Sequence, residues 1–468
     1  MKITTFSLVN ISFFLWTFIS VSTVINAQNT SIPDSNFEQA LINSGYDTAP
    51  IDGMVPTANI NTITQLNVTG KSIADLTGIE DFAALQFLTV TNNNLTTLNL
   101  SSNTVLIAMS CDDNSLTSLT LPNTNSFQGL FCSNNQLTSL DVSAYPNLTN
   151  LECDNNLLTG ELDLSNNLQL EIINCNENQL TSLNLDQQVN TNLKELYCSI
   201  NEINQLNVTN FPELTQLFFL DNNISSIDVT QNTKLIQLGS GKNPLGSLDV
   251  SQNVDLENLG CYENQLTELD ISNNNKLQRL SCYINEITSL DLSNKPDLIH
   301  LWAHVNNLQE LDLSNNPNLE RLQSGANDLT YLNVKNGNNT IITQFNAAPN
   351  PNLTCIIVDD KDYSATNWTD IDANSTFVES DAKCQALAVE DFKIDGFMIY
   401  PNPFVNQITI SGKNMIVNEV DIYDYSGKKV RSIQWKGKST NLEGLPSGLY
   451  ILKIKTDKGT TARKMLKI

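Results

Sequence analysis

Leucine and other apolar residues recur at a fixed spacing through the middle of the chain. Segments beginning at Leu106, Leu256 and Leu277 align over 21 residues as L-x-x-L-x-C-x-x-N-x-L-T-x-L-D-L-S-x-N-x-x. The cysteine position of this pattern recurs in steps of 21 residues, with one step of 22 and one of 23, at Val90, Cys111, Cys132, Cys153, Cys175, Cys198, Phe219, Ser240, Cys261, Cys282, Ala303 and Ser324. These twelve units predict a solenoid, because each unit can bury its apolar side only against its neighbours.

The first half of each unit predicts a short strand followed by a turn. In L-x-C the leucine and the cysteine point inward and the middle residue points outward, because side chains alternate along a strand. The asparagine three residues after the cysteine position, for example Asn114 or Asn285, can bond backbone groups that the turn leaves without partners. The second half, L-x-x-L-D-L-S-x-N, nearly repeats the first, so we expect two extended sides per coil. Residues 85–334 are thus expected to form a mostly β solenoid of short parallel strands with few helices.

The solenoid needs a cap at each end to cover its open core. Within the expected N-terminal cap, residues 28–84, Ser35 and Glu38 have capping-box spacing and predict a short helix that ends at Gly45. Within the expected C-terminal cap, residues 335–388, we expect Tyr363, Trp368 and Phe377 to cover the last coil. The leucine pattern stops at residues 389–396, which are interpreted as a linker.

The whole repeat, from about residue 65 to residue 334, resembles the nested 21-residue class of bacterial leucine-rich repeats. In that class one coil holds two similar half-units. The resemblance implies a flattened arc or solenoid and a binding role, and it implies no chemistry. Both ends look like the caps of similar repeat proteins of flavobacterial type.

Residues 397–468 have a different pattern, with alternating apolar strands separated by Gly, Asn and Pro turns that predict a small β-sandwich. The motifs YPNP at 400–403, LPSGLY at 445–450 and RKMLKI at 463–468 resemble the type A sorting domain of the type IX secretion system of the Bacteroidetes. The resemblance implies a partner, the type IX secretion machinery, and passage through the outer membrane. It also implies removal of this domain and attachment of the body to surface lipopolysaccharide. An ordinary adhesive β-sandwich is the alternative.

The chain begins with Lys2, an apolar stretch over residues 6–25 and then Asn-Ala-Gln at 26–28, which predicts a signal peptide cut after Ala27. A membrane anchor is the alternative, but polar residues interrupt the stretch and no basic stop-transfer cluster follows it. We expect no transmembrane segment in the mature chain. Together with the sorting domain, the signal predicts a secreted protein attached to the outer membrane at the cell surface.

Charge is unevenly distributed along the chain. The net charge is −25, whereas residues 397–468 hold 12 basic and 5 acidic residues, a net of +7. Once Lys2 leaves with the signal, residues 28–396 therefore carry −33. A body this acidic repels nucleic acid and anionic membranes, so no nucleic-acid partner is expected.

Seven of the nine cysteines, Cys111 to Cys282, share one inward column. Parallel strands lie about 4.8 Å apart, whereas a disulfide prefers Cβ atoms about 3.8 Å apart. Phe219, Ser240 and Ala303 also fill the column, so small buried hydrophobes are favoured over disulfides or metal ligands. Cys355 and Cys384 lie outside the column and flank the C-terminal cap, where we predict a disulfide between them.

Candidates for catalysis are few. The chain has two histidines, His300 and His304, and it contains no G-x-S-x-G, H-E-x-x-H or phosphate-binding glycine loop. We therefore expect no enzymatic activity and no cofactor. The second half-repeat also contains a column of aspartates. The favoured interpretation is that their carboxylates accept hydrogen bonds from the backbone and from nearby hydroxyl groups. The alternative is calcium binding at Asp249, Asp270, Asp291 and Asp312.

Aromatic residues and histidines gather at the outward positions, which the repeat itself does not dictate. They form the predicted ligand face, Tyr197, Phe218, Tyr262, Tyr283, His300, Trp302 and His304. Neighbouring glycines would leave a shallow depression, and such a surface suits an extracellular protein or glycan. The alternative is that these aromatic residues are covered by the caps or by another chain. A metal site at the two histidines is not favoured, because no third ligand clearly converges on them. The function predicted is surface-displayed binding or adhesion, and the alternative is a structural surface or matrix component without a ligand site.

Overall fold

The computed structural model describes residues 28–185, 192–385, 398–411, 416–457 and 459–468. The predicted signal peptide, residues 1–27, and the predicted linker, residues 389–396, lie outside these ranges.

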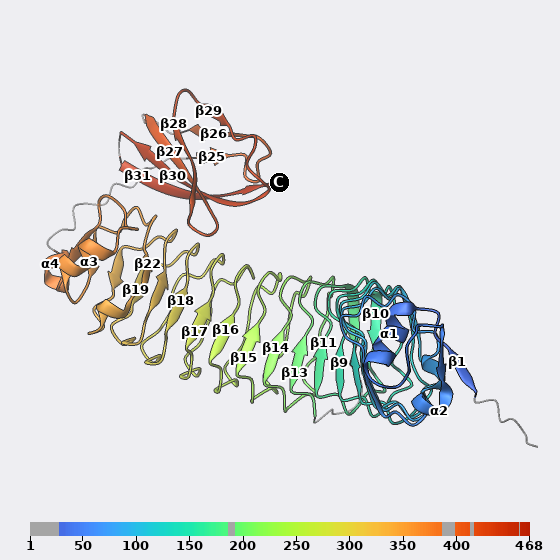
Figure 1. The fold of residues 1–468 in the computed structure, drawn as a ribbon. Helices are drawn as coiled ribbons and strands as arrows, with labels where there is room; N and C mark the ends of the chain where they lie inside the picture. The colour runs from blue at the N-terminus through green and yellow to red at the C-terminus, as the bar shows by residue number, and fades with distance from the viewer. Residues whose placement is uncertain (1–27, 186–191, 386–397, 412–415, 458) are drawn as a thin grey trace, which may run out of the picture.

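The predicted solenoid is confirmed, and its main feature is a sheet of 14 parallel strands along one side (Figure 1). Leucines pair with leucines across it, for example Leu259 with Leu280 and Leu280 with Leu301. One strand precedes and one follows the twelve that hold the repeat pattern. In sheet order from the N-terminal end the strands are β3 (Gln65–Asn67), β4 (Phe87–Thr89), β6 (Ala108–Ser110), β8 (Gly129–Phe131), β9 (Asn150–Glu152), β11 (Ile172–Asn174), β13 (Glu195–Tyr197), β14 (Gln216–Phe218), β15 (Gln237–Gly239), β16 (Asn258–Gly260), β17 (Arg279–Ser281), β18 (His300–Trp302), β20 (Arg321–Gln323) and β22 (Gln344–Asn346).

The opposite side of the coils is extended as expected, but it forms ladders over only part of the described solenoid. These shorter parallel sheets pair β5 (Thr97–Asn99) with β7 (Ser118–Thr120), and β10 (Thr159–Asp163) with β12 (Gln179–Asn184). A further sheet contains β19 (Glu310–Asp312), β21 (Tyr331–Asn333), β23 (Cys355–Ile357) and β24 (Thr376–Val378).

The core between the two sides is made of stacked leucine and cysteine columns. Leu259, Leu280 and Cys261 are at most 2 % exposed, and all seven cysteines of the column are buried and free. Burial raises the pKa of Cys198 and of Cys282 to about 12. At neutral pH these thiols are uncharged and act as small apolar groups.

The N-terminal cap contains β1 (Asn29–Ser31), α1 (Ser35–Asn43), β2 (Met54–Pro56), α2 (Thr57–Ile60) and the 3-10 helix η1 (Ile79–Asp81). The predicted helix is present, but the capping box at Ser35 is wrong. Asp34 is the N-cap, and its carboxylate accepts from the backbone N–H groups of Asn36 and Phe37 at 2.8 and 3.0 Å. Glu38 is fully buried and accepts instead from the backbone of Asp52 and Gly53, so tertiary contacts override the local motif.

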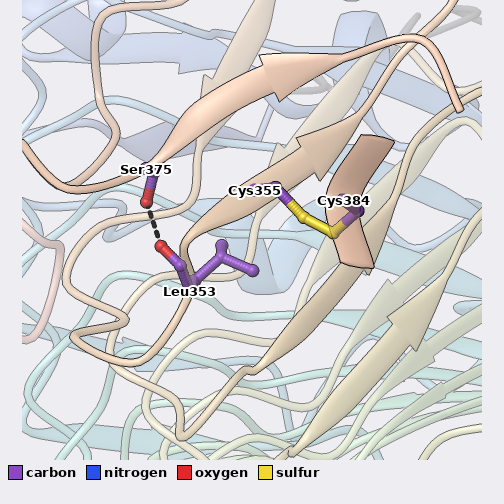
Figure 2. The surroundings of a disulfide bond; sticks show 4 residues. All are labelled: Leu353, Cys355, Ser375 and Cys384. Atoms are coloured by element: carbon purple, nitrogen blue, oxygen red, sulfur yellow. Dashed lines mark hydrogen bonds between the residues drawn. A yellow bond between two sulfur atoms is a disulfide. The ribbon is translucent and has the colours of Figure 1, made fainter. Parts of the chain in front are cut away.

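The C-terminal cap contains the 3-10 helix η2 (Asn339–Ile341), α3 (Lys361–Asn367) and α4 (Asp381–Gln385). Trp368 stacks on Phe345 of the last long-sheet strand with ring centroids 4.3 Å apart, and Phe377 meets both rings edge-on. The predicted disulfide joins Cys355 on β23 to Cys384 on α4, with Cα atoms 5.6 Å apart (Figure 2). It ties the last helix of the cap to the last sheet, as the sequence predicted.

The C-terminal domain is all-β with antiparallel sheets, as predicted. One sheet contains β25 (Met398–Tyr400), β26 (Gln407–Ser411) and β29 (Ser439–Asn441). The other contains, in sheet order, β28 (Lys429–Gln434), β27 (Val417–Asp424), β30 (Gly448–Thr456) and β31 (Gly459–Lys467). Phe404, Ile422, Leu452 and Trp435 belong to the core of this domain.

Candidate binding face

Each coil projects two outward side chains from the long sheet, one in the middle of L-x-C and one directly after it. The chain then turns at a residue with positive φ, for example Ile284 at 54°, which directly precedes the asparagine that recurs in each repeat. In that position the amide of Asn285 donates to the carbonyls of Cys261 and Cys282 at 2.9 and 3.0 Å, and its oxygen accepts from Leu266 N–H at 3.0 Å. These bonds join neighbouring coils and hold the outward side chains in register.

Three rings at the position after L-x-C form what we call the aromatic ladder: Tyr262, Tyr283 and His304. Their centroids are 4.6 Å apart at both steps and the ring planes differ by 4° and 8°. Gly241 precedes them in the same column, and a Cβ atom there would lie 2.5 Å from the Tyr262 ring. The ring faces therefore cover one another, and the ladder is half-buried.

The other four predicted ligand residues are also half-buried. Tyr197, Phe218 and Trp302 occupy the middle of L-x-C and end their strands, whereas His300 begins β18. Trp302 meets His300 edge-on at 5.0 Å on β18, beside the aromatic ladder. Tyr197 and Phe218 stack at 5.6 Å on β13 and β14, and the Tyr197 hydroxyl contacts Glu195 and Gln216 oxygens at 2.9 Å each.

The structure thus separates the predicted face into two groups. The pair Tyr197 and Phe218 forms one group, and the aromatic ladder with Trp302 and His300 forms the other. Gly239 and Gly260, which follow Phe218 in the same column, lie between them. Stacking along the sheet turns the ring faces of the aromatic ladder toward each other and leaves ring edges outward.

A cavity lies at the second group. It is lined on the solenoid by Ser281, Tyr283, Trp302, His304, Gln323 and Gln344, and on the C-terminal domain by Tyr425 and Ser426. Its volume is about 410 Å³. Aromatic and amide side chains thus meet in one hollow formed by two parts of the chain.

Both histidines at this face are neutral at pH 7. Burial lowers the pKa of His304 to about 4. Burial first, and then the charges of Arg321 and Arg279, lower the pKa of His300. The buried Nδ1 atoms of His300 and His304 lack a hydrogen-bond partner among the described residues. Over the same residues, no group of three or more His, Cys, Asp or Glu side chains is placed to hold a metal ion.

Sequence reasoning missed an acidic, hydrogen-bonded surface on the earlier coils of the same sheet. Asp112 accepts from Ser110 Oγ at 2.7 Å, and Asp154 accepts from Asn174 Nδ2 at 2.9 Å. Burial is the main cause that raises the pKa of Asp112 and of Glu152, and neighbouring carboxylates add to it. The alternation of Asp112 and Asp154 at the position after the cysteine was the signal in the sequence.

The aspartate column lies on the other side of the coils and is exposed. Each predicted calcium ligand accepts from the backbone N–H two residues later at 2.9 Å; these pairs are Asp249 with Ser251, Asp270 with Ser272, Asp291 with Ser293 and Asp312 with Ser314. Hydrogen bonds from Ser272 and Ser293 lower the pKa of Asp270 and of Asp291. The favoured interpretation thus accounts for this column, and calcium binding stays a prediction.

Comparison with known proteins covers both parts of the chain. Residues 398–468 match the family described as the secretion system C-terminal sorting domain. The functional domain of InlJ from Listeria monocytogenes, which includes a cysteine ladder, is 25 % identical with a TM-score of 0.59, over 94 % of this chain and 99 % of that one. A leucine-rich-repeat protein of Leptospira interrogans is 19 % identical with a TM-score of 0.50, over 72 % of this chain and 97 % of that one, and shows the shared fold. No curated protein matches the chain by sequence.

Proposed function

The chain is a leucine-rich-repeat protein with a type IX secretion sorting domain, exported to the cell surface, and we propose that it binds a protein partner there through the aromatic ladder and Trp302. The ranges that the structure describes contain no helix long and apolar enough to cross a membrane. One observation carries the proposal. The outward position after L-x-C holds no aromatic residue in the earlier coils and then Tyr262, Tyr283 and His304 in three successive coils. The inward leucine column continues through the same coils as it does elsewhere, so the repeat itself does not require these rings.

The geometry of the rings favours a protein over a glycan. A sugar ring stacks on a free aromatic face, but the facing sides of Tyr262, Tyr283 and His304 are covered within the ladder. Ring edges, hydroxyl groups and the amides of Gln323 and Gln344 are typical of the mixed apolar and polar centre of a protein interface. We further propose that the chain acts through binding and not through catalysis.

The test is an array of extracellular proteins and glycans probed with the full chain, with added calcium and with a chelator. Trp302→Ala and Tyr283→Ala are expected to lower affinity for a protein hit about 30-fold or more, since each removes a side chain of the kind that forms binding hot spots. Phe87→Ala is the matched control, because Phe87 is an outward aromatic on β4, 39 % exposed, and far along the sheet from the cavity.

Circular dichroism of each variant checks that the solenoid is intact. Hits on proteins that Trp302→Ala loses and Phe87→Ala keeps would support the proposal. Binding that survives both face variants would exclude this face, hits restricted to glycans would overturn the protein assignment, and assembly into oligomers without any hit would indicate a structural component.

A further inference from the structure

One row of turn residues changes character in three successive coils. The residue two places after the cysteine position takes positive φ in every coil, and most coils place Asn, Asp, Glu or Lys there. Ile284, Val305 and Ala326 occupy this row at 54°, 59° and 55°. Left-handed backbone is costly for β-branched residues, so an aliphatic row here has no local explanation. Ile200 is the other aliphatic member and is exposed, whereas Val305 is 1 % exposed.

This apolar row is buried by the C-terminal domain. Val305 and Ala326 form a hydrophobic cluster with Ile451 of β30, and Ile284 packs against it. Tyr423, Leu449 and Ala462 complete the cluster from β27, β30 and β31. Figure 1 shows the sheet that contains β27, β30 and β31 beside the coils of β18 to β22. Ile451 is 2 % exposed and lies outside the domain's own core, so the solenoid is what covers it.

Two lysines of the C-terminal domain add polar contacts at the same boundary. Lys453 pairs with Asp372 of the C-terminal cap, and their side chains are only 12 % and 1 % exposed. Lys464 donates to the carbonyl of Asn285 at 3.3 Å. The basic domain and the acidic body are also complementary in charge, with +7 on residues 397–468.

The same contact places a turn over the candidate binding face. Tyr425 and Ser426 follow β27 and line the cavity opposite Tyr283, Trp302 and His304. The backbone of Tyr425 bonds to the His304 ring and opposes the lowering of its pKa. The turn occupies part of the space in front of these rings that a bound protein partner would need.

We propose that the C-terminal domain is a lid that docks on the row Ile284, Val305 and Ala326 and closes the aromatic face until the domain moves away. This proposal rests on the proposed function in one respect, because the face that the lid closes is the face that we assign to the protein partner. Closure itself is a property of the free chain, so it can be measured without any partner.

The experiment uses diethyl pyrocarbonate, which acylates neutral histidine, and mass spectrometry of the full chain at pH 7. The chain has two histidines, and His300 lies outside the residues that line the covered cavity, so it serves as the internal reference for His304. In the unmodified protein we expect His304 to react more slowly than His300.

Two variants open the lid from opposite sides. Ile451→Asp places a carboxylate in the hydrophobic cluster. Val305→Asn removes the apolar contact and introduces asparagine, which tolerates left-handed backbone, so the turn itself is preserved. Each is expected to raise the His304 to His300 rate ratio about tenfold, which corresponds to about 1.4 kcal/mol in the closing equilibrium. Val430→Asp is the control, because Val430 is 40 % exposed on β28 of the same sheet.

An increased ratio in both opening variants, with no change in Val430→Asp, would support the lid. A ratio that stays constant in Val305→Asn, the variant that leaves the C-terminal domain unaltered, would overturn it. The partner screen is therefore run with the Val305→Asn chain as well as with the unmodified chain. Binding to the Val305→Asn chain that Trp302→Ala removes would support the proposed function whatever the histidine ratio shows, and absence of binding to the Val305→Asn chain would count against the proposed function alone.

Discussion

Two buried asparagines in consecutive coils provide a sharp test of what holds the solenoid together. Asn264 and Asn285 occupy the same position of the repeat and are 0 % and 4 % exposed. The Asn285 side chain makes five hydrogen bonds; it donates to Cys261, Cys282 and Tyr283 carbonyls and accepts from Asn264 and Leu266 N–H groups. The Asn264 side chain makes two, to the Tyr262 carbonyl at 3.1 Å and to Ser240 Oγ at 3.5 Å.

The difference in bonding sets the expected difference in stability. Asn285→Ala leaves the Cys261 carbonyl and the N–H groups of Asn264 and Leu266 without a partner, and at roughly 1 kcal/mol each the loss is about 3 kcal/mol. Asn264→Ala removes two weaker bonds and also removes a buried oxygen that has no partner, so we expect a loss of about 1 kcal/mol. The two substitutions delete the same atoms, so the cavity contribution is similar in both.

The assay is urea unfolding of the full chain, followed by circular dichroism. Hydrogen exchange over residues 256–292 serves as a local measure, because repeat proteins can open coil by coil. Asn306→Ala is the positive reference, since the Asn306 amide donates to Cys282 and Ala303 carbonyls and its oxygen accepts from Ile287. Equal losses for Asn264→Ala and Asn285→Ala would refute the reasoning, because burial alone and not the bonds between coils would then set the cost.

Two further predictions concern pH and the disulfide. Burial lowers the pKa of His304 from the ordinary histidine value of 6.5 to about 4 in the folded chain. The unfolded chain therefore binds the proton first, and stability falls as pH decreases from about 6.5 to about 4. The loss of stability attributable to His304 is at most about 3 kcal/mol. It is measured as the difference in unfolding free energy between the unmodified chain and His304→Gln at each pH. A difference that does not change with pH would contradict the prediction. Reduction of the Cys355–Cys384 bond, which closes a loop of sequence separation 29, is expected to destabilise the C-terminal cap by about 3 kcal/mol. Hydrogen exchange of α4 and β24 should then speed up while that of β9 to β16 does not, and uniform acceleration along the solenoid would argue against a local clamp.

Sequence periodicity alone determined the architecture of the solenoid. The 21-residue spacing defined which residues pair, and the register of Leu259 with Leu280 follows it. The column of buried cysteines followed from the same spacing. The pairing of Cys355 with Cys384 followed because these two cysteines lie outside that column and flank the C-terminal cap. These features are predictable because each coil contacts mainly the coil before it and the coil after it, so that position along the repeat equals position in space.

Local motifs were less decisive wherever a tertiary contact competed with them. Ser35 and Glu38 have the spacing of a capping box, but Asp34 caps the helix and also accepts from the backbone of Ala74 and Asp75. A carboxylate that satisfies four N–H groups stabilises more than a local pair, and the sequence does not reveal that residues 74–75 lie beside it.

Sequence also determined that Tyr262, Tyr283 and His304 point outward on consecutive coils, because side chains alternate along each strand and the repeat sets the column. The tertiary structure alone decided that these rings stack face to face and that Tyr425 lies opposite Tyr283 and His304. It likewise decided that Ile284, Val305 and Ala326, which break the polar turn row, meet Ile451 of another domain. The physical reason is that contacts within the repeat are fixed by a constant spacing, whereas docking of the C-terminal domain depends on complementarity between surfaces more than a hundred residues apart, which no periodicity encodes.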